Sequence, residues 1–201
     1  MRKIVLASAS PRRAELLRQT GIKFEVEPAA NEEAPFKTGD PHEYARSLSL
    51  SKAREVGARH NDALVIAADT FGMLDGRFIG KPRTPAGAVK ILESMSGKRH
   101  TVISGFTVLD SRSGDYVSRS VETGVYFRKL SRGEVEAYVT TGEPLDKAGA
   151  YAIQGKGAAL VERIEGDYYN VVGLPLAALA EALKEFGVDT PSLLSLPPRE
   201  R

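Results

Sequence analysis

A run of six apolar residues, Ala63–Ala68, sets the strongest limit on the fold of this chain, and it is followed directly by Asp69. A strand that is apolar at every position is typical of a parallel or mixed sheet covered on both faces. Open α/β sheets place their ligand crevices at the carboxyl ends of such strands. Because an unpaired carboxylate there would be costly, we expect Asp69 to be matched by a cation, a metal ion or water.

The segments around this run alternate between strand-like and helix-like patterns, which predicts an α/β fold. Capping side chains followed by proline mark helix starts at Ser10-Pro11, Asp40-Pro41 and Thr84-Pro85. The expected strands are 3–7, 22–27, 63–68, a hairpin over 71–79, 100–109, 116–128 and 159–164. The expected helices are 11–20, 41–58, 85–96, 132–141 and 175–186. The long antiparallel pair within 100–128 indicates a mixed sheet.

Two stretches show neither the helix-like nor the strand-like pattern of apolar residues. Residues 143–157 form a glycine-rich loop, and long ordered loops are often functional. Residues 190–201 contain Pro197-Pro198 and end in charged residues. We expect them to form a loose tail.

The composition of the 201 residues excludes several classes of protein. There is no cysteine, so a metal would be bound by carboxylates, which favours Mg²⁺ or Mn²⁺. No stretch approaches the roughly 18 apolar residues of a membrane span, and the apolar run at the start is too short for a signal peptide. The net charge of +2 is too small to indicate a nucleic-acid surface. We expect a cytoplasmic protein with no nucleic-acid or membrane partner; the sequence leaves the oligomeric state open, a homodimer included.

The segment Ser8-Ala-Ser-Pro-Arg-Arg13 joins a strand to the start of a helix. The N–H groups and the dipole of a helix start favour an anion. Arg12 and Arg13 oppose that dipole unless a phosphate lies between them. For this motif alone, an ordinary helix cap with two solvated arginines is an equally good interpretation.

Two lysines add to this motif. Lys52 lies on the apolar stripe of its helix, where it could extend to water or point into a crevice, and Lys81 lies between a glycine and a proline. Taken singly, each lysine is better explained as a surface residue without a function. Together with the arginines, with Lys147 and with the carboxylates of Asp69 and Glu32/Glu33, they suit a polyphosphate bridged by a divalent metal.

Other catalytic motifs are missing from the sequence. It contains no P-loop lysine motif, Rossmann glycine fingerprint, zincin HExxH or GxSxG elbow. The three histidines have no metal-binding spacing, which argues against histidine-based catalysis.

With these motifs in order, the chain resembles the Maf family of nucleoside triphosphate pyrophosphatases, historically linked to inhibition of septum formation. The resemblance covers nearly the whole chain, and its blocks are specific only in combination. They are Ala7-Ser-Ala-Ser-Pro-Arg-Arg13, Lys52-Ala53, Ala68-Asp69-Thr70, Gly80-Lys81-Pro82, Ser96-Gly97-Lys98, Gly142-Glu-Pro-Leu-Asp-Lys-Ala-Gly-Ala-Tyr151, Ile153-Gln154-Gly155 and Val172-Gly-Leu-Pro175. The chain departs from the family at Phe71, where a small aliphatic residue is expected beside the catalytic position, and more mildly at Asn31.

The resemblance implies an α/β fold with a mixed, elongated, twisted sheet and flanking helices. Residues 1–189 would form one two-lobed catalytic domain around a central cleft, as in the inosine triphosphate pyrophosphatases. It also implies hydrolysis between the α- and β-phosphates with Mg²⁺ or Mn²⁺ as cofactor.

The resemblance further assigns roles to individual residues. Asp69 is implied as the proton acceptor, and Asp69 and Glu33 as metal ligands; whether Asp69 acts as base or as metal ligand stays open. The residues implied to bind phosphate are Ser8, Arg12, Arg13, Lys52 and Lys81. Those implied to select the base are Arg12, Thr70 and Gln154.

Similarity places the chain with the members of the family that hydrolyse dTTP and UTP, a reaction that would also suit removal of modified pyrimidine nucleotides. An amide at Gln154 offers both a donor and an acceptor, which matches the N3–H and carbonyl oxygens of thymine or uracil. Two alternatives remain open: 7-methyl-GTP as the substrate of the same reaction, and a low-turnover nucleotide sensor that regulates cell division.

Overall fold

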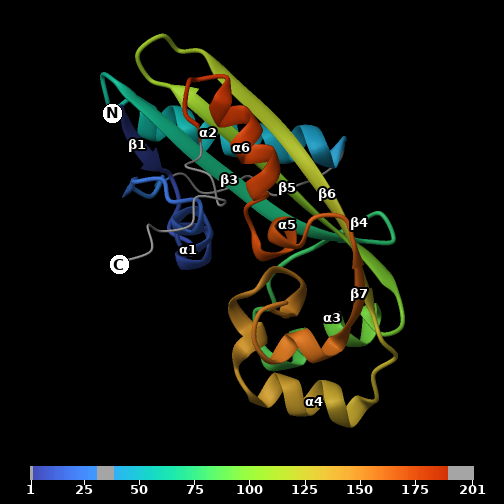
Figure 1. Ribbon diagram of the computed structural model, residues 1–201. Helices are drawn as coiled ribbons and strands as arrows, with labels where there is room; N and C mark the ends of the chain where they lie inside the picture. Colours follow the sequence, from blue (N-terminus) through green and yellow to red (C-terminus); the bar gives the residue numbers. More distant parts are fainter. Residues whose placement is uncertain (1, 31–38, 190–201) are drawn as a thin grey trace, which may run out of the picture. The chain divides into compact units, whose positions relative to one another are not determined.

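A computed structural model describes residues 2–30 and 39–189 of the chain, which adopt a mixed α/β fold (Figure 1). The strands are β1 (Lys3–Leu6), β2 (Glu25–Val26), β3 (Ala63–Leu74), β4 (Arg77–Ile79), β5 (Arg99–Asp110), β6 (Tyr116–Phe127) and β7 (Val161–Glu165). The α-helices are α1 (Pro11–Gln19), α2 (Pro41–Gly57), α3 (Pro85–Met95), α4 (Arg132–Thr140), α5 (Tyr168–Val172) and α6 (Leu176–Lys184). Three 3₁₀ segments are η1 (Glu143–Asp146), η2 (Ala148–Ala150) and η3 (Lys156–Leu160).

Within the described residues, the strands form one sheet in the order β2-β1-β3-β5-β6-β7, with β4 paired to β3. β1 runs parallel to β2 and β3, whereas the pairs β3–β4 and β6–β7 are antiparallel. The expected mixed, open sheet with flanking helices is therefore confirmed. Of the expected strand at 22–27 only β2 forms, and η3 replaces the start of the strand expected at 159–164. Helix α5 was not expected. No described helix has both the length and the apolar character needed to cross a membrane.

The chain divides into two compact units. The first comprises Met1–Asp69, Ser104–Val121 and Gly173–Arg201, and the second comprises Thr70–Ile103 and Glu122–Val172. Three of the boundaries fall within β3, β5 and β6, and the fourth follows the end of α5. The expectation that residues 1–189 form one catalytic domain around a cleft stays a prediction, and the tail expected at 190–201 lies outside the described residues.

The core of the first unit explains the apolar run of β3. Val65 and Ala67 pack on β1 and against Ala53 and Val56 of α2. The alternate side chains, among them Ile66, have no exposed surface either. Because successive side chains of a strand point to opposite faces, the run 63–68 is covered on both, as the sequence predicts.

The strand does not end at Asp69, and that expectation is wrong. β3 continues to Leu74 because its last residues pair with β4, from Gly72 opposite Ile79 onward. The parallel pairing of β3 with β1, in contrast, reaches only to Ile66. Asp69 therefore lies inside a long strand, between the stretches that pair with β1 and with β4.

Helix α2 contacts the sheet at unusually short range. A Cβ added to Gly105 of β5 would lie 2.0 Å from the carbonyl oxygen of Ala45, so only glycine allows this approach. Beside it, the hydroxyls of Ser49 on α2 and Thr107 on β5 are 2.9 Å apart in the interior. These contacts fix the position along the sheet from which α2 presents its side chains.

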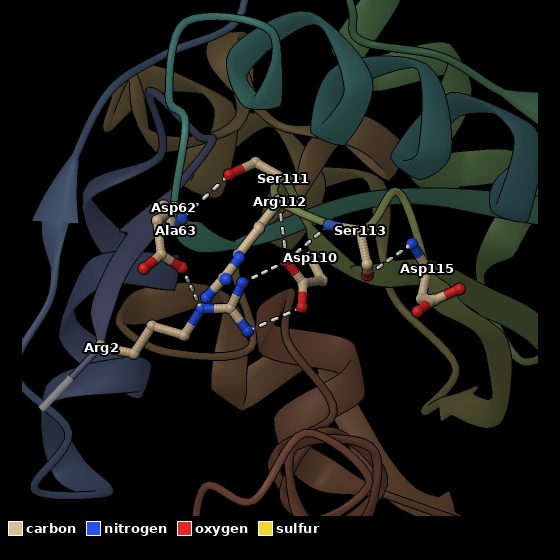
Figure 2. Close-up of polar contacts among 8 residues, drawn as sticks. All are labelled: Arg2, Asp62, Ala63, Asp110, Ser111, Arg112, Ser113 and Asp115. Carbon is tan, nitrogen blue, oxygen red and sulfur yellow. Dashed lines mark hydrogen bonds and ion pairs between the residues drawn. The ribbon is translucent and has the colours of Figure 1, made fainter.

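Arg2 joins three segments at the start of β1 (Figure 2). Its Nε donates to Asp62 at 2.8 Å, and its two terminal nitrogens donate to the two carboxylate oxygens of Asp110, one of them at 2.7 Å. The backbone N–H of Ala63 donates to the hydroxyl of Ser111 at 2.9 Å, so the end of β5 lies against the start of β3. The Arg2 guanidinium holds the pKa of the Asp110 carboxyl well below its usual range.

Candidate active site

The turn from β1 to α1 carries the first group of candidate residues. Ser10 caps the helix, and its hydroxyl accepts from the backbone N–H of Arg13. Ser8 is buried, and its hydroxyl accepts from the N–H of Ser10 at 3.2 Å and from the Arg13 guanidinium at 3.4 Å. Arg13 also donates through Nε to the carbonyl of Gly173 at 2.9 Å. Arg13 thus stabilises the turn through these hydrogen bonds and also adds a positive charge to it.

Arg12 differs from its neighbour. It lies half-buried in the first turn of α1, which carries no acidic residue. In the described part of the chain, no hydrogen bond or ion pair engages its guanidinium. Arg12 thus adds a positive charge to a helix start, which itself favours an anion.

Asp69 and Lys52 form an ion pair between β3 and α2. Asp69 follows Val65 and Ala67 at two-residue spacing, so its side chain lies on the face of β3 that packs against α2. Lys52 precedes Ala53, which packs on that face, and only 15 % of its side chain and 8 % of that of Asp69 are exposed. Lys52 supplies the cation that the carboxylate requires.

The two groups lie at one end of the parallel pair β1–β3. The pairing closes with a hydrogen bond from the N–H of Ala7 to the carbonyl of Ile66, at 2.8 Å. Ser8 follows Ala7 directly, and Asp69 lies three residues beyond Ile66. Because both strands run in the same direction, this is the end at which open α/β sheets bind their ligands.

The remaining candidates belong to the second unit. Thr70 is half-buried in β3, and both Lys81 and Gln154 are exposed. No hydrogen bond or ion pair among the described residues engages the side chain of Lys81 or Gln154. The carbonyl of Gly80, next to Lys81, accepts from the N–H of Gly149 at 3.2 Å, which ties Lys81 to the loop 143–157.

The candidate residues divide between the two units. Ser8, Arg12, Arg13, Lys52 and Asp69 belong to the first, and Thr70, Lys81 and Gln154 to the second. A single site built from both groups stays a prediction.

Two other residues noted in the sequence have local roles. Lys147 forms an ion pair with its neighbour Asp146. Phe71 is 3 % exposed, with its ring 5.3 Å from that of Phe78. Phe71 therefore forms an aromatic contact between the two strands of the β3–β4 hairpin.

The donors for a divalent metal can be assessed only in part. Glu33, together with Glu32 and Asn31, lies outside the described residues. Among those that are described, no three histidine, aspartate or glutamate side chains cluster as metal ligands. Asp69 nevertheless offers a hard oxygen donor, and Mg²⁺ commonly takes one or two carboxylates and completes its shell with substrate phosphates and water. Among the described residues, Asp69 is therefore the one candidate carboxylate considered for such an ion.

Sequence reasoning missed Glu143. Its carboxylate accepts from the backbone N–H groups of Lys156 at 3.1 Å and Gly157 at 3.0 Å, and from the hydroxyl of Tyr138 at 2.8 Å. The signal was an acidic residue at the start of a glycine-rich loop, where backbone N–H groups need acceptors.

Comparisons with known proteins cover most of the chain. The family model described as "Maf-like protein" matches residues 3–186. A protein of Moorella thermoacetica named dTTP/UTP pyrophosphatase is 50% identical over 189 residues, which cover 94% of this chain and 97% of that protein. A protein of Methanosarcina barkeri with the same name is 51% identical, with coverage of 94% and 96%. A crystal structure of a Mycobacterium abscessus nucleoside-triphosphatase (dITP/XTP pyrophosphatase) aligns with 96% of this chain and 100% of its own at 16% identity, with a TM-score of 0.45.

Proposed function

This chain belongs to the Maf family, and from that premise we propose that it hydrolyses dTTP and UTP to the nucleoside monophosphate and pyrophosphate. One structural observation carries the proposal. The Lys52–Asp69 ion pair lies at the same end of the β1–β3 pair as the turn that carries Arg12 and Arg13. This supports a site in which a carboxylate that acts on water works beside cations that bind phosphate.

The proposed phosphate site uses these cations. A triphosphate is highly anionic, and arginine binds phosphate with a planar fork of donors. Arg12 and the start of α1 would bind it together with Arg13 and Lys52, and Lys81 would add a contact from the second unit. Their charges would stabilise the negative charge that develops on the leaving pyrophosphate.

Asp69 is the proposed base. It would take a proton from a water molecule as the water oxygen bonds to the α-phosphorus. The bond to the bridging oxygen between the α- and β-phosphates then breaks, and pyrophosphate leaves with the bonding electrons. Mg²⁺ or Mn²⁺, held by Asp69 with Glu33, would neutralise phosphate oxygens and acidify bound water. Lys52 would hold the Asp69 carboxylate in position.

The proposed base site depends on Gln154, with Thr70 and Arg12. The exposed Gln154 amide has a donor and an acceptor to offer to the N3–H and a carbonyl of uracil or thymine. A guanine nucleotide presents two donors along the corresponding edge, which an amide matches less well.

The experiment is a pyrophosphate-release assay over dTTP, UTP, CTP, GTP, 7-methyl-GTP and base-modified pyrimidine triphosphates, each with Mg²⁺ and with Mn²⁺. We expect dTTP and UTP to have the highest kcat/KM, with the monophosphate and pyrophosphate as products. In H₂¹⁸O, the label should enter the monophosphate, because the attack is on the α-phosphorus.

Three outcomes would contradict parts of the proposal. Label in the pyrophosphate would reject attack on the α-phosphorus. A preference for 7-methyl-GTP would reject the pyrimidine assignment alone. Tight nucleotide binding without turnover would favour the sensor.

A further inference from the structure

The carboxylate of Glu143 is enclosed by the loop that carries Gln154. One carboxylate oxygen accepts from the N–H of Gly157 and the hydroxyl of Tyr138, and the other accepts from the N–H of Lys156. Successive backbone N–H groups that converge on an anion form a nest. The anion in this nest is a side chain of the same chain.

The glycines of the loop fit this arrangement. A Cβ added to Gly155, whose φ is +103°, would lie 2.8 Å from a carboxylate oxygen of Glu143. A Cβ added to Gly157 would lie 2.5 Å from the carbonyl oxygen of Ala152 and 2.6 Å from the hydroxyl of Tyr138. Side chains at either position would force the segment open.

The segment before Gln154 is tied to the same group. The hydroxyl of Tyr138 accepts from the N–H of Ala152 at 3.2 Å while it donates to Glu143. Tyr151 is buried and anchored by His100, whose Nε2 is 2.9 Å from its hydroxyl. Gln154 is thus the exposed middle of a short segment held on both sides.

We propose that Glu143 is a positioning residue for base selection, which holds the backbone of residues 152–157 so that Gln154 presents its amide to the nucleobase from a fixed position. This inference rests on the proposed function. An exposed amide on a loose loop can rotate to suit any base edge, so selectivity needs a fixed backbone. Glu143, Tyr138 and the two glycines supply that rigidity.

The charge state of Glu143 agrees with this role. Burial by itself would raise the pKa of its carboxyl, but the hydrogen bonds from Tyr138, Gly157 and Lys156 outweigh burial and lower it. Glu143 is therefore an anion at neutral pH, and its bonds to the loop are charge-assisted.

The test is the substitution Glu143→Gln, which keeps the size of the side chain but removes its charge and turns one oxygen into a donor that faces an N–H group. The proposed catalysis at the phosphates does not use this residue. We expect the ratio of kcat/KM for UTP to that for GTP to fall about ten-fold, mainly through a higher KM for UTP. Glu136→Gln is the matched control, since Glu136 is exposed on α4 and pairs with Arg132, and the ratio should not change.

Two further experiments distinguish a positioning role of Glu143 from a general loss of structure or activity. Tyr138→Phe removes one hydroxyl from the network and should lower the same ratio by a smaller factor. In a double-mutant cycle, Glu143→Gln should change the ratio little once Gln154 is alanine, because no amide is left to position.

The inference is overturned if Glu143→Gln lowers kcat/KM for UTP and GTP by the same factor, or if its effect persists in full beside Gln154→Ala. Failure of the parent protein to hydrolyse UTP or dTTP would instead reject the proposed function. The two failures are therefore distinguishable.

Discussion

The ammonium of Lys52 and the carboxylate of Asp69 form an ion pair in which 15 % and 8 % of the two side chains are exposed. Removing one partner of a nearly buried pair leaves the other charge without compensation. A substitution of Lys52 or Asp69 should therefore affect both stability and catalysis. Its effect has to be measured on the free energy of unfolding as well as on the reaction rate.

Asp69→Asn should reduce kcat by at least about 100-fold, the usual contribution of a general base. It should also lower the free energy of unfolding by about 1 to 3 kcal/mol, because Lys52 loses its counter-charge. Steady-state kinetics and urea denaturation measure the two effects.

The control is the double variant Asp69→Asn/Lys52→Met. Removing the stranded ammonium should restore much of the lost stability but none of the activity. Recovery of activity together with stability would show that Asp69 supports the fold and takes no part in the chemistry.

Arg12 and Arg13 should respond differently to alanine. Arg12→Ala should lower kcat/KM at least ten-fold and change unfolding by less than about 0.5 kcal/mol, the usual range for a surface substitution without partners. Arg13→Ala should also cost about 1 kcal/mol of stability, since the bonds to Ser8 and Gly173 are lost. Arg18→Ala, near the other end of the same helix, is the kinetic control. Equal losses of stability in Arg12→Ala and Arg13→Ala would contradict the role of Arg13 in stabilising the turn.

Much of the first unit follows from the sequence, because its signals are local. The apolar run predicts the first half of β3, and the capping residues before proline predict α1 and α2 closely. The extension of β3 through Asp69 was missed, because a charged residue after an apolar run is typical of a strand end. The strand continues because its later residues pair with β4, and a contact with another strand is not visible in the local sequence pattern.

The candidate site was predictable by residue type but not by partner. The apolar run predicts that Asp69 needs a cation, a metal ion or water as partner, yet nothing local in the sequence shows that Lys52 is that cation. The Glu143 nest was missed because its donors follow 13 and 14 residues later in an aperiodic loop. That Arg12 and Gln154 serve one site stays a prediction from the family resemblance, since no sequence period relates the two residues.

Gln154→Glu tests base selection directly. The change keeps the shape but removes the donor and adds a charge. A buried hydrogen bond left unsatisfied costs about 1 to 3 kcal/mol, and each 1.4 kcal/mol is a factor of ten. We expect kcat/KM for dTTP and UTP to fall about ten-fold or more, and that for GTP to fall less or to rise. An unchanged ranking of dTTP, UTP, GTP and 7-methyl-GTP would exclude Gln154 from base selection.

The Arg2–Asp110 pair should determine part of the acid stability. Its two hydrogen bonds are charge-assisted, and only 14 % of the Asp110 side chain is exposed. Asp110→Asn should lower the free energy of unfolding at pH 7 by about 2 kcal/mol. Asp75→Asn is the matched control, because the Asp75–Lys98 pair is 66 % and 50 % exposed and should contribute almost nothing.

The pH dependence follows from the lowered pKa of Asp110 in the folded state. Above the unfolded value of about 4, both states are ionised and the stabilisation is complete. As the pH falls below about 4, only the unfolded state gains the proton, so the stabilisation is lost progressively down to the folded pKa. The difference in unfolding free energy between the parent and Asp110→Asn should therefore be constant from pH 7 to 5 and shrink from pH 4 to 2. Urea denaturation at each pH measures it, and since both proteins share every other titrating group, those contributions cancel. A difference that stayed constant down to pH 2 would show that the stability comes from packing around Asp110 instead of its charge.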